Sequence, residues 1–221
     1  MFVKAQILIA VILVSGTLFA GLPEPATPVA EIVFVALDTE TTGFSPKNDR
    51  LIEIGAVRFR GNGEILAVTN WMINPGMPIR PQATEVNGIT DAMVAGAPPF
   101  SAVCPEFVSF CDGSVLLAHN ATFDVGFLRA GFARAGVSAP ELPILDTLPL
   151  FRVWFPQAKS FALEPLAQYL GLQNEMWHRA GADSFHLIDI FKIGVTARPE
   201  LKFQELERGA GGIKLLNERR N

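Results

Sequence analysis

Three short segments of this 221-residue chain place acidic side chains where a buried core would not use them. "DTETTGF" carries Asp38 and Glu40 two residues apart, "HNATFD" ends in Asp124, and "HRAGAD" begins with His178 and ends in Asp183. The first segment directly follows the apolar run "IVFVAL", which is typical of a buried strand. Residues i and i+2 of a strand point the same way, so its two carboxylates converge at the strand's end.

Converging carboxylates repel one another, so one must take a proton or a cation must lie between them. Oxygen-only ligands suit a hard cation such as Mg²⁺ or Mn²⁺. The carboxylates of the three segments are about enough to hold two such ions, which together can activate a water molecule and stabilise the leaving oxygen of a phosphodiester. A nearby imidazole could accept the proton of that water. Taken alone, Asp38 and Glu40 could instead cap a turn.

Hydrophobic periodicity indicates which elements hold these side chains. The second and third apolar runs flank "GNG", a hairpin signal that predicts an antiparallel pair. The segment over residues 74–90 is rich in proline and glycine and is predicted to be a loop. The expected strands cover residues 32–37, 51–60, 64–74, 114–120 and 143–147. The expected helices lie within residues 90–100, 100–111, 122–136, 148–156, 161–172 and 179–195.

This order of elements predicts an α/β domain over residues 32–196, with a mixed five-stranded sheet flanked by helices. Residues 197–221 are polar and are predicted to form a weakly ordered C-terminal tail. Asp146 is expected to cap the helix that follows it, and Asp91 is a similar cap candidate. His119 is expected to orient the turn between its strand and the next helix.

The first 31 residues differ from the rest of the chain. Residues 5–22 carry no charge, and a helix of that length would span about 27 Å, close to the roughly 30 Å of a bilayer core. The proline-rich "LPEPATPVAE" that follows is predicted to be a linker. Small residues at a cleavage site are lacking, so we expect an uncleaved hydrophobic anchor, oriented by Lys4 with the domain outside the membrane. The alternatives are a start codon assigned too far upstream or a helix that packs on the domain, and either would make the protein cytoplasmic.

Composition excludes several classes of protein. Nearly half of the residues are apolar, which favours a globular core over disorder. The net charge of −4 argues against a protein that coats nucleic acid by bulk positive charge, although bound metal ions could still meet phosphates. Cys104 and Cys111 lie seven residues apart on one predicted helix, too far apart for a disulfide.

The three acidic segments, in this order, resemble the motifs of the DEDDh 3'-5' exonucleases. These are DnaQ-like exonucleases of the ribonuclease H-like fold, and they include the epsilon proofreading subunit of bacterial DNA polymerase III. The resemblance extends over residues 32–195 and includes "INPGMPIRPQATEVNGITDAMVAGAPPF", "ILDTLPLFRVWFP" and "SFALEPLAQYLGL". Two positions depart from the family pattern. Asn87 stands where family members often have histidine, outside the catalytic set, and His186 follows the third motif, where we expect a packing or surface residue.

The resemblance implies a role for each matching residue. Asp38, Glu40, Asp124 and Asp183 would hold two divalent cations, Mg²⁺ or Mn²⁺, and His178 would be the general base. Small Ala180 would let its loop lie close to the site. Thr41, Thr42, Gly43 and Phe44 would line the pocket for the terminal nucleotide, with Phe44 against the last base, and Asn120 and Phe123 would lie beside the substrate strand.

The implied activity is hydrolysis of the terminal phosphodiester at a 3' end of single-stranded DNA or RNA, with release of nucleoside 5'-monophosphates. The resemblance implies that 3' end and a DNA polymerase as partners, and the uncharged residues 5–22 separately predict contact with a membrane. The alternative is a non-catalytic module of the same fold that binds nucleic acid or a polymerase.

Overall fold

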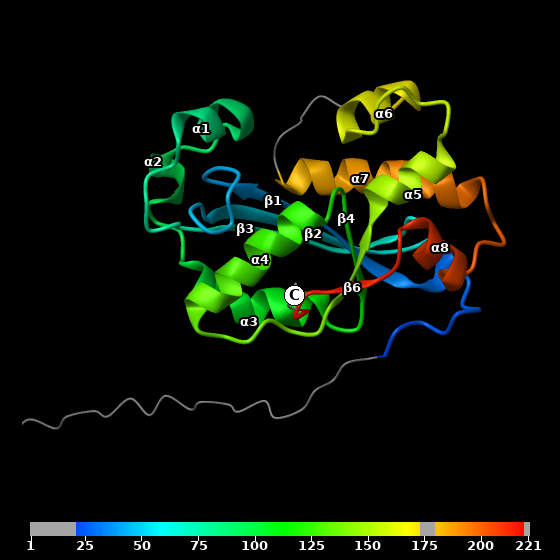
Figure 1. The fold of residues 1–221 in the computed structure, drawn as a ribbon, viewed down its shortest axis with the longest axis horizontal. Helices are drawn as coiled ribbons and strands as arrows, with labels where there is room; N and C mark the ends of the chain where they lie inside the picture. The colour runs from blue at the N-terminus through cyan, green and yellow to red at the C-terminus, as the bar shows by residue number, and fades with distance from the viewer. Residues whose placement is uncertain (1–20, 173–179, 219–221) are drawn as a thin grey trace, which may run out of the picture.

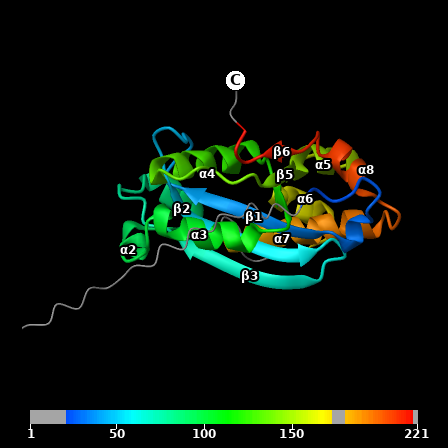
Figure 2. The ribbon, with the colours of Figure 1, turned by 90° about the horizontal axis from the view of Figure 1, so that it is seen from below.

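The computed structural model describes residues 21–172 and 180–218, and its centre is a six-stranded mixed sheet in the order β3-β2-β1-β4-β5-β6. The antiparallel pairs are β1–β2, β2–β3 and β5–β6, and β4 runs parallel to both β1 and β5. Figure 2 shows β3 at one edge of the sheet. The strands are β1 (Val33–Thr41), β2 (Leu51–Arg60), β3 (Ile65–Met72), β4 (Val115–Ala118), β5 (Pro143–Asp146) and β6 (Lys214–Leu215). The predicted mixed sheet and its hairpin are confirmed, but the prediction of five strands was wrong, because two-residue β6 is too short to produce a periodic pattern.

Helices cover both faces of this sheet, which Figure 1 shows with α5 and α7 on one side and α3 and α4 on the other. The pleat of β1 divides its side chains between two cores. Phe34 and Ala36 pack in the core formed with α5 to α8, whereas Val35 and Leu37 pack in the core formed with α3 and α4. The described helices are α1 (Pro81–Asn87), α2 (Asp91–Val94), α3 (Phe100–Cys111), α4 (Thr122–Ala135), α5 (Thr147–Trp154), α6 (Leu163–Tyr169), α7 (Ala180–Thr196) and α8 (Phe203–Gly209).

Helix α1 corrects the prediction of a loop over residues 74–90. It begins with Pro81 in its first turn, where a missing N–H costs nothing, and ends at Gly88 in the left-handed conformation. Seven residues between these signals are too few for a clear helical period. Asp91 does not cap α2; its Oδ1 accepts a hydrogen bond from the Ile79 N–H at 2.9 Å and so ties the chain ahead of α1 to α2.

The described part of the C-terminal segment is not the weakly ordered extension that was predicted. Helix α8 buries Phe203 and Leu206 in the core, and β6 extends the sheet. The polar composition of residues 197–221 gave no sign of α8 and β6, because so short a helix can pack through only one or two apolar side chains.

The predicted linker also packs on the domain. Val29, in the short 3-10 helix η1 (Val29–Glu31), is buried in the core, and its N–H bonds to the Leu201 carbonyl. Gly61 permits this approach, because a Cβ there would lie 1.9 Å from the Val29 carbonyl oxygen. The predicted hydrophobic helix falls on residues 1–20, outside the described residues. Within residues 21–172 and 180–218, every helix is too short or too polar to cross a bilayer.

Candidate active site

Three carboxylates meet at the end of β1. Asp38 and Glu40 extend from that strand and Asp183 from the first turn of α7, and one oxygen of each lies within 4.8 Å of the others. An all-carboxylate donor set at this spacing fits a hard divalent cation, because the ion would offset the repulsion among them.

A glycine on the neighbouring strand allows α7 to reach this point. Gly55 pairs with Asp38 across β1 and β2, and a Cβ at Gly55 would lie 2.2 Å from the Ala180 carbonyl carbon and 2.3 Å from the Gly181 nitrogen. The first turn of α7 therefore rests directly on the β2 backbone. Ser184 fixes it there, because its hydroxyl contacts the Gly55 carbonyl at 3.1 Å. Ala180 is fully buried at this contact, in agreement with the expectation of a small residue.

Asp124, the fourth predicted ligand, lies in the same cavity but outside the group of three. It is buried in the first turn of α4 and accepts a hydrogen bond from the Thr39 hydroxyl at 2.7 Å. Thr39 lies between Asp38 and Glu40 in sequence, so this bond ties the carboxylate from α4 to the strand that carries the other two.

Burial makes these acids hard to ionise. It raises the pKa of Asp38 well above its usual range, and the charge of Asp124, followed by that of Glu40, raises it further. Burial also raises the pKa of Glu40 to about 7, against a hydrogen bond from Asn87 that lowers it. The pKa of Asp124 rises to about 7 for the same reason, opposed by the bond from Thr39. Without a cation, Asp38, Glu40 and Asp124 therefore resist full ionisation near neutral pH, and a bound divalent cation would favour their charged forms.

Two residues beside the cluster were not among the predicted site residues: Glu53, which the sequence reasoning missed, and Asn87, which it placed outside the catalytic set. Glu53 pairs with Glu40 across the strands, is 1% exposed, and accepts hydrogen bonds from the Asn70 amide at 2.9 Å and the Ala180 N–H at 3.2 Å. Asn87, at the end of α1, donates to Glu40 Oε2 at 3.2 Å. Glu53 could have been found as the one acid inside the apolar run "LIEIGAV", once its register with Glu40 was considered. The contact of Asn87 depends on α1, which the sequence did not reveal.

The cluster lies in a cavity of about 430 Å³. The predicted substrate residues Thr41, Gly43, Phe44, Asn120 and Phe123 all line it, together with Arg80, Gln82, Ala83, Val86, Asn87 and His119. Phe44 is 83% exposed, which is unusual for a large aromatic side chain and leaves its face available for stacking. Thr42 lies apart from this lining: it is fully buried, and its hydroxyl accepts a hydrogen bond from the Arg50 N–H.

The turn between β4 and α4 is held from β5. Asn120 has a φ of 60°, which asparagine tolerates better than most residues, and its N–H donates to Asp146 Oδ1 at 3.0 Å. The same oxygen caps α5 through the Leu148 N–H, as predicted. His119 Nε2 lies 2.7 Å from the Phe161 carbonyl and Nδ1 3.0 Å from the Thr147 hydroxyl. Both ring nitrogens of His119 are thus engaged and burial lowers its pKa, and its expected role in orienting the turn stays a prediction.

The predicted general base, His178, lies outside the described residues. His186 is buried on α7, as expected of a packing residue.

Comparisons with known proteins agree with this geometry. The exonuclease family model (RNase_T) matches residues 35–191. A PolC-type DNA polymerase III of Clostridium perfringens is 39% identical over 186 residues, which are 84% of this chain and 12% of that protein. The corresponding polymerase of Streptococcus suis is 38% identical over 174 residues, 75% of this chain and 12% of that protein. The chain thus spans about 12% of the length of these relatives.

Two solved structures share the fold. Exonuclease X in complex with 5' overhanging duplex DNA superimposes with a TM-score of 0.66 at 23% identity, over 80% of this chain and 99% of that one. The zinc-bound E. coli exonuclease I complex with single-stranded DNA gives a TM-score of 0.69 at 23% identity, over 76% of this chain and 42% of that one. The match of the family model over most of the domain, the close polymerase relatives and this shared ribonuclease H-like fold lead to one conclusion: the chain belongs to the exonuclease family and is a DnaQ-like exonuclease domain.

Proposed function

We propose that the domain is a metal-dependent 3'-5' exonuclease that releases nucleoside 5'-monophosphates from the 3' end of single-stranded DNA or RNA. The observation that carries this proposal is the cluster of Asp38, Glu40 and Asp183, which each place one oxygen within 4.8 Å of the others inside a cavity lined by the exposed aromatic Phe44.

The acidic residues and His178 have different roles in the proposed site. Asp38, Glu40, Asp124 and Asp183 would hold two divalent cations, Mg²⁺ or Mn²⁺, which when bound would activate the attacking water and stabilise the leaving oxygen. Since the four acids come from β1, α4 and α7, the fold fixes the site from three directions. His178, in the third motif, would accept the proton of the attacking water.

The remaining lining residues would bind the terminal nucleotide. Phe44 at the mouth would stack on the last base, a contact that every base can make and that requires no particular sequence. Thr41, Gly43, Asn120 and Phe123 would surround its sugar and phosphate. A cavity of about 430 Å³ is within the range of small-ligand sites and has room for one nucleotide. Because the relatives are DNA polymerases, we also propose that the domain associates with a polymerase.

The test of this function is release of mononucleotides from 3'-labelled single-stranded DNA and RNA. We expect release of labelled mononucleotides with Mg²⁺ or Mn²⁺ and none with EDTA. An oligonucleotide with the same label but a chemically blocked 3' end should release little. A His178→Ala variant should lose about 10²–10⁴-fold in kcat, the usual contribution of a general base. Binding of single strands without any cleavage would favour the non-catalytic alternative.

We further propose that residues 5–22 anchor the chain to a membrane. The alternative is that these residues form no anchor and that the domain lies in the cytoplasm. The structure defines where a truncation can be made. A chain that starts at residue 21 keeps Val29 and its bond to Leu201, and should be fully active and absent from the membrane fraction. A chain that starts at Val33 loses the buried Val29 side chain, so we expect its stability to fall by about 2 kcal/mol or more. Fractionation of the full chain and urea unfolding of both truncations test these two expectations, and a full-length chain found only in the soluble fraction would refute the anchor.

A further inference from the structure

The loop between β1 and β2 is organised around one buried acid, Asp49. Its side chain is 1% exposed, and its Oδ2 accepts a hydrogen bond from the Ser45 N–H at 2.8 Å. The carboxylate lies directly against Gly43, where a Cβ would come within 2.7 Å of it. Gly43 and Phe44 line the cavity, so the position of Asp49 sets the position of this wall.

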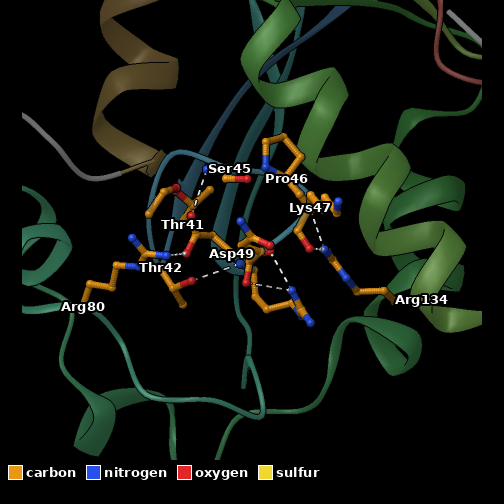
Figure 3. Close-up of polar contacts among 11 residues, drawn as sticks. Thr41, Thr42, Ser45, Pro46, Lys47, Asp49, Arg80 and Arg134 are labelled. Carbon is orange, nitrogen blue, oxygen red and sulfur yellow. Dashed lines mark hydrogen bonds and ion pairs between the residues drawn. The ribbon is translucent and has the colours of Figure 1, made fainter.

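Two arginines hold the loop from opposite sides, as Figure 3 shows. On one side, Arg134 from α4 donates to the carbonyls of Pro46 and Lys47. On the other, Arg80 Nη2 lies 3.0 Å from Asp49 Oδ1. This oxygen accepts no hydrogen bond from the residues described, so the guanidinium charge is what compensates it.

Arg80 differs from Arg134 in its surroundings. It immediately precedes α1, its side chain remains 55% exposed despite the ion pair, and it lines the cavity. Among the described residues of that lining, it alone carries a permanent positive charge. A guanidinium has five N–H donors in a planar fork, and within the described part of the chain the ion pair with Asp49 engages only Nη2 of Arg80, so donors remain for another anion.

A single strand of nucleic acid needs such a contact here. The protein has a net charge of −4 and the cavity holds a cluster of carboxylates, so a cationic side chain in its lining would offset repulsion of the backbone upstream of the terminal nucleotide. Divalent cations at Asp38, Glu40 and Asp183 would compensate the scissile phosphate alone.

We propose that Arg80 binds a backbone phosphate of the substrate strand upstream of the scissile bond, and that Asp49 is the positioning residue that orients it. This inference rests on the proposed exonuclease function. Because Asp49 also lies against Gly43 and accepts the Ser45 N–H, one buried carboxylate contacts both Arg80 and the loop that carries Phe44.

Arg80→Gln tests the contact through its salt dependence. Each phosphate contact to a single strand contributes about 0.7 to the slope of log affinity against log salt concentration, so the slope for KM should fall by about that amount. We expect KM for a single-stranded oligonucleotide to rise about tenfold, kcat to change less than twofold, and Arg80→Lys to recover most of the loss. The matched control is Arg60→Gln, which removes an exposed arginine paired with Glu64 away from the cavity and should change neither value.

Neutral linkages locate the phosphate. Three oligonucleotides each carry one methylphosphonate, at the first, second or third linkage upstream of the scissile bond. One of them should raise the KM of the wild-type protein about tenfold and leave that of Arg80→Gln unchanged. If all three affect both proteins equally, or if the salt slope of Arg80→Gln equals that of the wild type, the inference is wrong. Mg²⁺-dependent cleavage by the wild type in the same assay keeps that failure separate from a failure of the proposed function.

The role of Asp49 is tested by non-additivity. Asp49→Asn keeps an oxygen for the Ser45 N–H but removes the charge that orients Arg80, so it should raise KM and reduce the salt slope as Arg80→Gln does. When Asp49→Asn is added to the Arg80→Gln variant, KM should rise by less than a further twofold. Thermal unfolding identifies a variant that is merely unfolded, and Arg80→Gln, at an exposed position, tests the phosphate contact even if Asp49→Asn does not fold. Full additivity of the two effects would contradict the orienting role.

Discussion

Asp183→Asn is expected to reduce kcat about 10²–10³-fold while the protein remains folded. The change removes one of three carboxylates whose oxygens lie within 4.8 Å, so the site would lose a charged ligand and affinity for divalent cations together. The fold should persist because the packing of the first turn of α7 depends on Gly55 and Ser184. Initial rates on single-stranded DNA, measured over a range of Mg²⁺ concentrations, give both kcat and the apparent affinity for the ion.

The same helix supplies the control. Asp189→Asn makes the same chemical change six residues further along α7, outside the cavity, and should leave kcat within twofold. Loss of activity in both variants would mean that α7 tolerates no change, and a new variant at Asp38 would then be needed to decide. Activity of Asp183→Asn within tenfold of the wild type would contradict the assignment of the site.

The sequence predicted the cluster because its logic is local. Alternation in β1 places Asp38 and Glu40 on one side whatever the rest of the fold does. The expectation that Asp124 in α4 and Asp183 in α7 join them came from the resemblance of the three ordered motifs to the exonuclease family. The apolar run "LIEIGAVRFR" predicted its strand to the residue, whereas the bounds of the other predicted strands differ by one or more residues from those observed.

The sequence could not reveal side-chain contacts between residues that are far apart along the chain. Asn87 reaches Glu40 across 47 residues, and Thr39 reaches Asp124 across 85. The ion pair of Asp49 with Arg80 joins two segments that both read as loop, rich in glycine, proline and polar residues. Such contacts follow from how the chain is folded, so no periodicity along the sequence encodes them.

The described residues outside 32–196 show where prediction from composition fails. Composition marked residues 22–31 and 197–221 as linker and tail, yet Val29 and Phe203 are buried in the same core. The two segments also pair directly, through the bridge between Pro28 and Lys202 and the bond from the Phe203 N–H to the Thr27 carbonyl. Each segment has too few apolar residues to predict its packing alone, and they become ordered by packing together.

Without divalent cations, the stability of the domain is expected to fall as the pH rises from about 4 to above 7. Burial raises the pKa of Glu40 and of Asp124 to about 7 in the folded protein, and raises that of Asp38 as well. In the unfolded chain these acids titrate near 4. Between the two values the folded state binds more protons, so the free energy of unfolding decreases with increasing pH and the cost is complete above the folded pKa.

Asp38→Asn removes one of these charges and should therefore stabilise the metal-free protein at pH 8, by roughly 1–3 kcal/mol, and have little effect at pH 4. Mg²⁺ should reverse the order of stability. A cation bound at 100 times its Kd adds about 2.7 kcal/mol to the wild type, whereas the variant lacks the ligand needed to bind it tightly. Urea unfolding at pH 4 and pH 8, with EDTA or with Mg²⁺, gives the four free energies required for each protein.

Glu106→Gln, an exposed acid on α3, is the control and should shift none of these values by more than about 0.5 kcal/mol. The decisive comparison is the sign of the difference between Asp38→Asn and the wild type at pH 8. A positive difference in EDTA and a negative one in Mg²⁺ would show that the acids are held close together at a cost that the cation removes. If Asp38→Asn were less stable than the wild type in EDTA at pH 8, the carboxylate would be contributing to the fold itself, and repulsion within the cluster would not be the dominant effect.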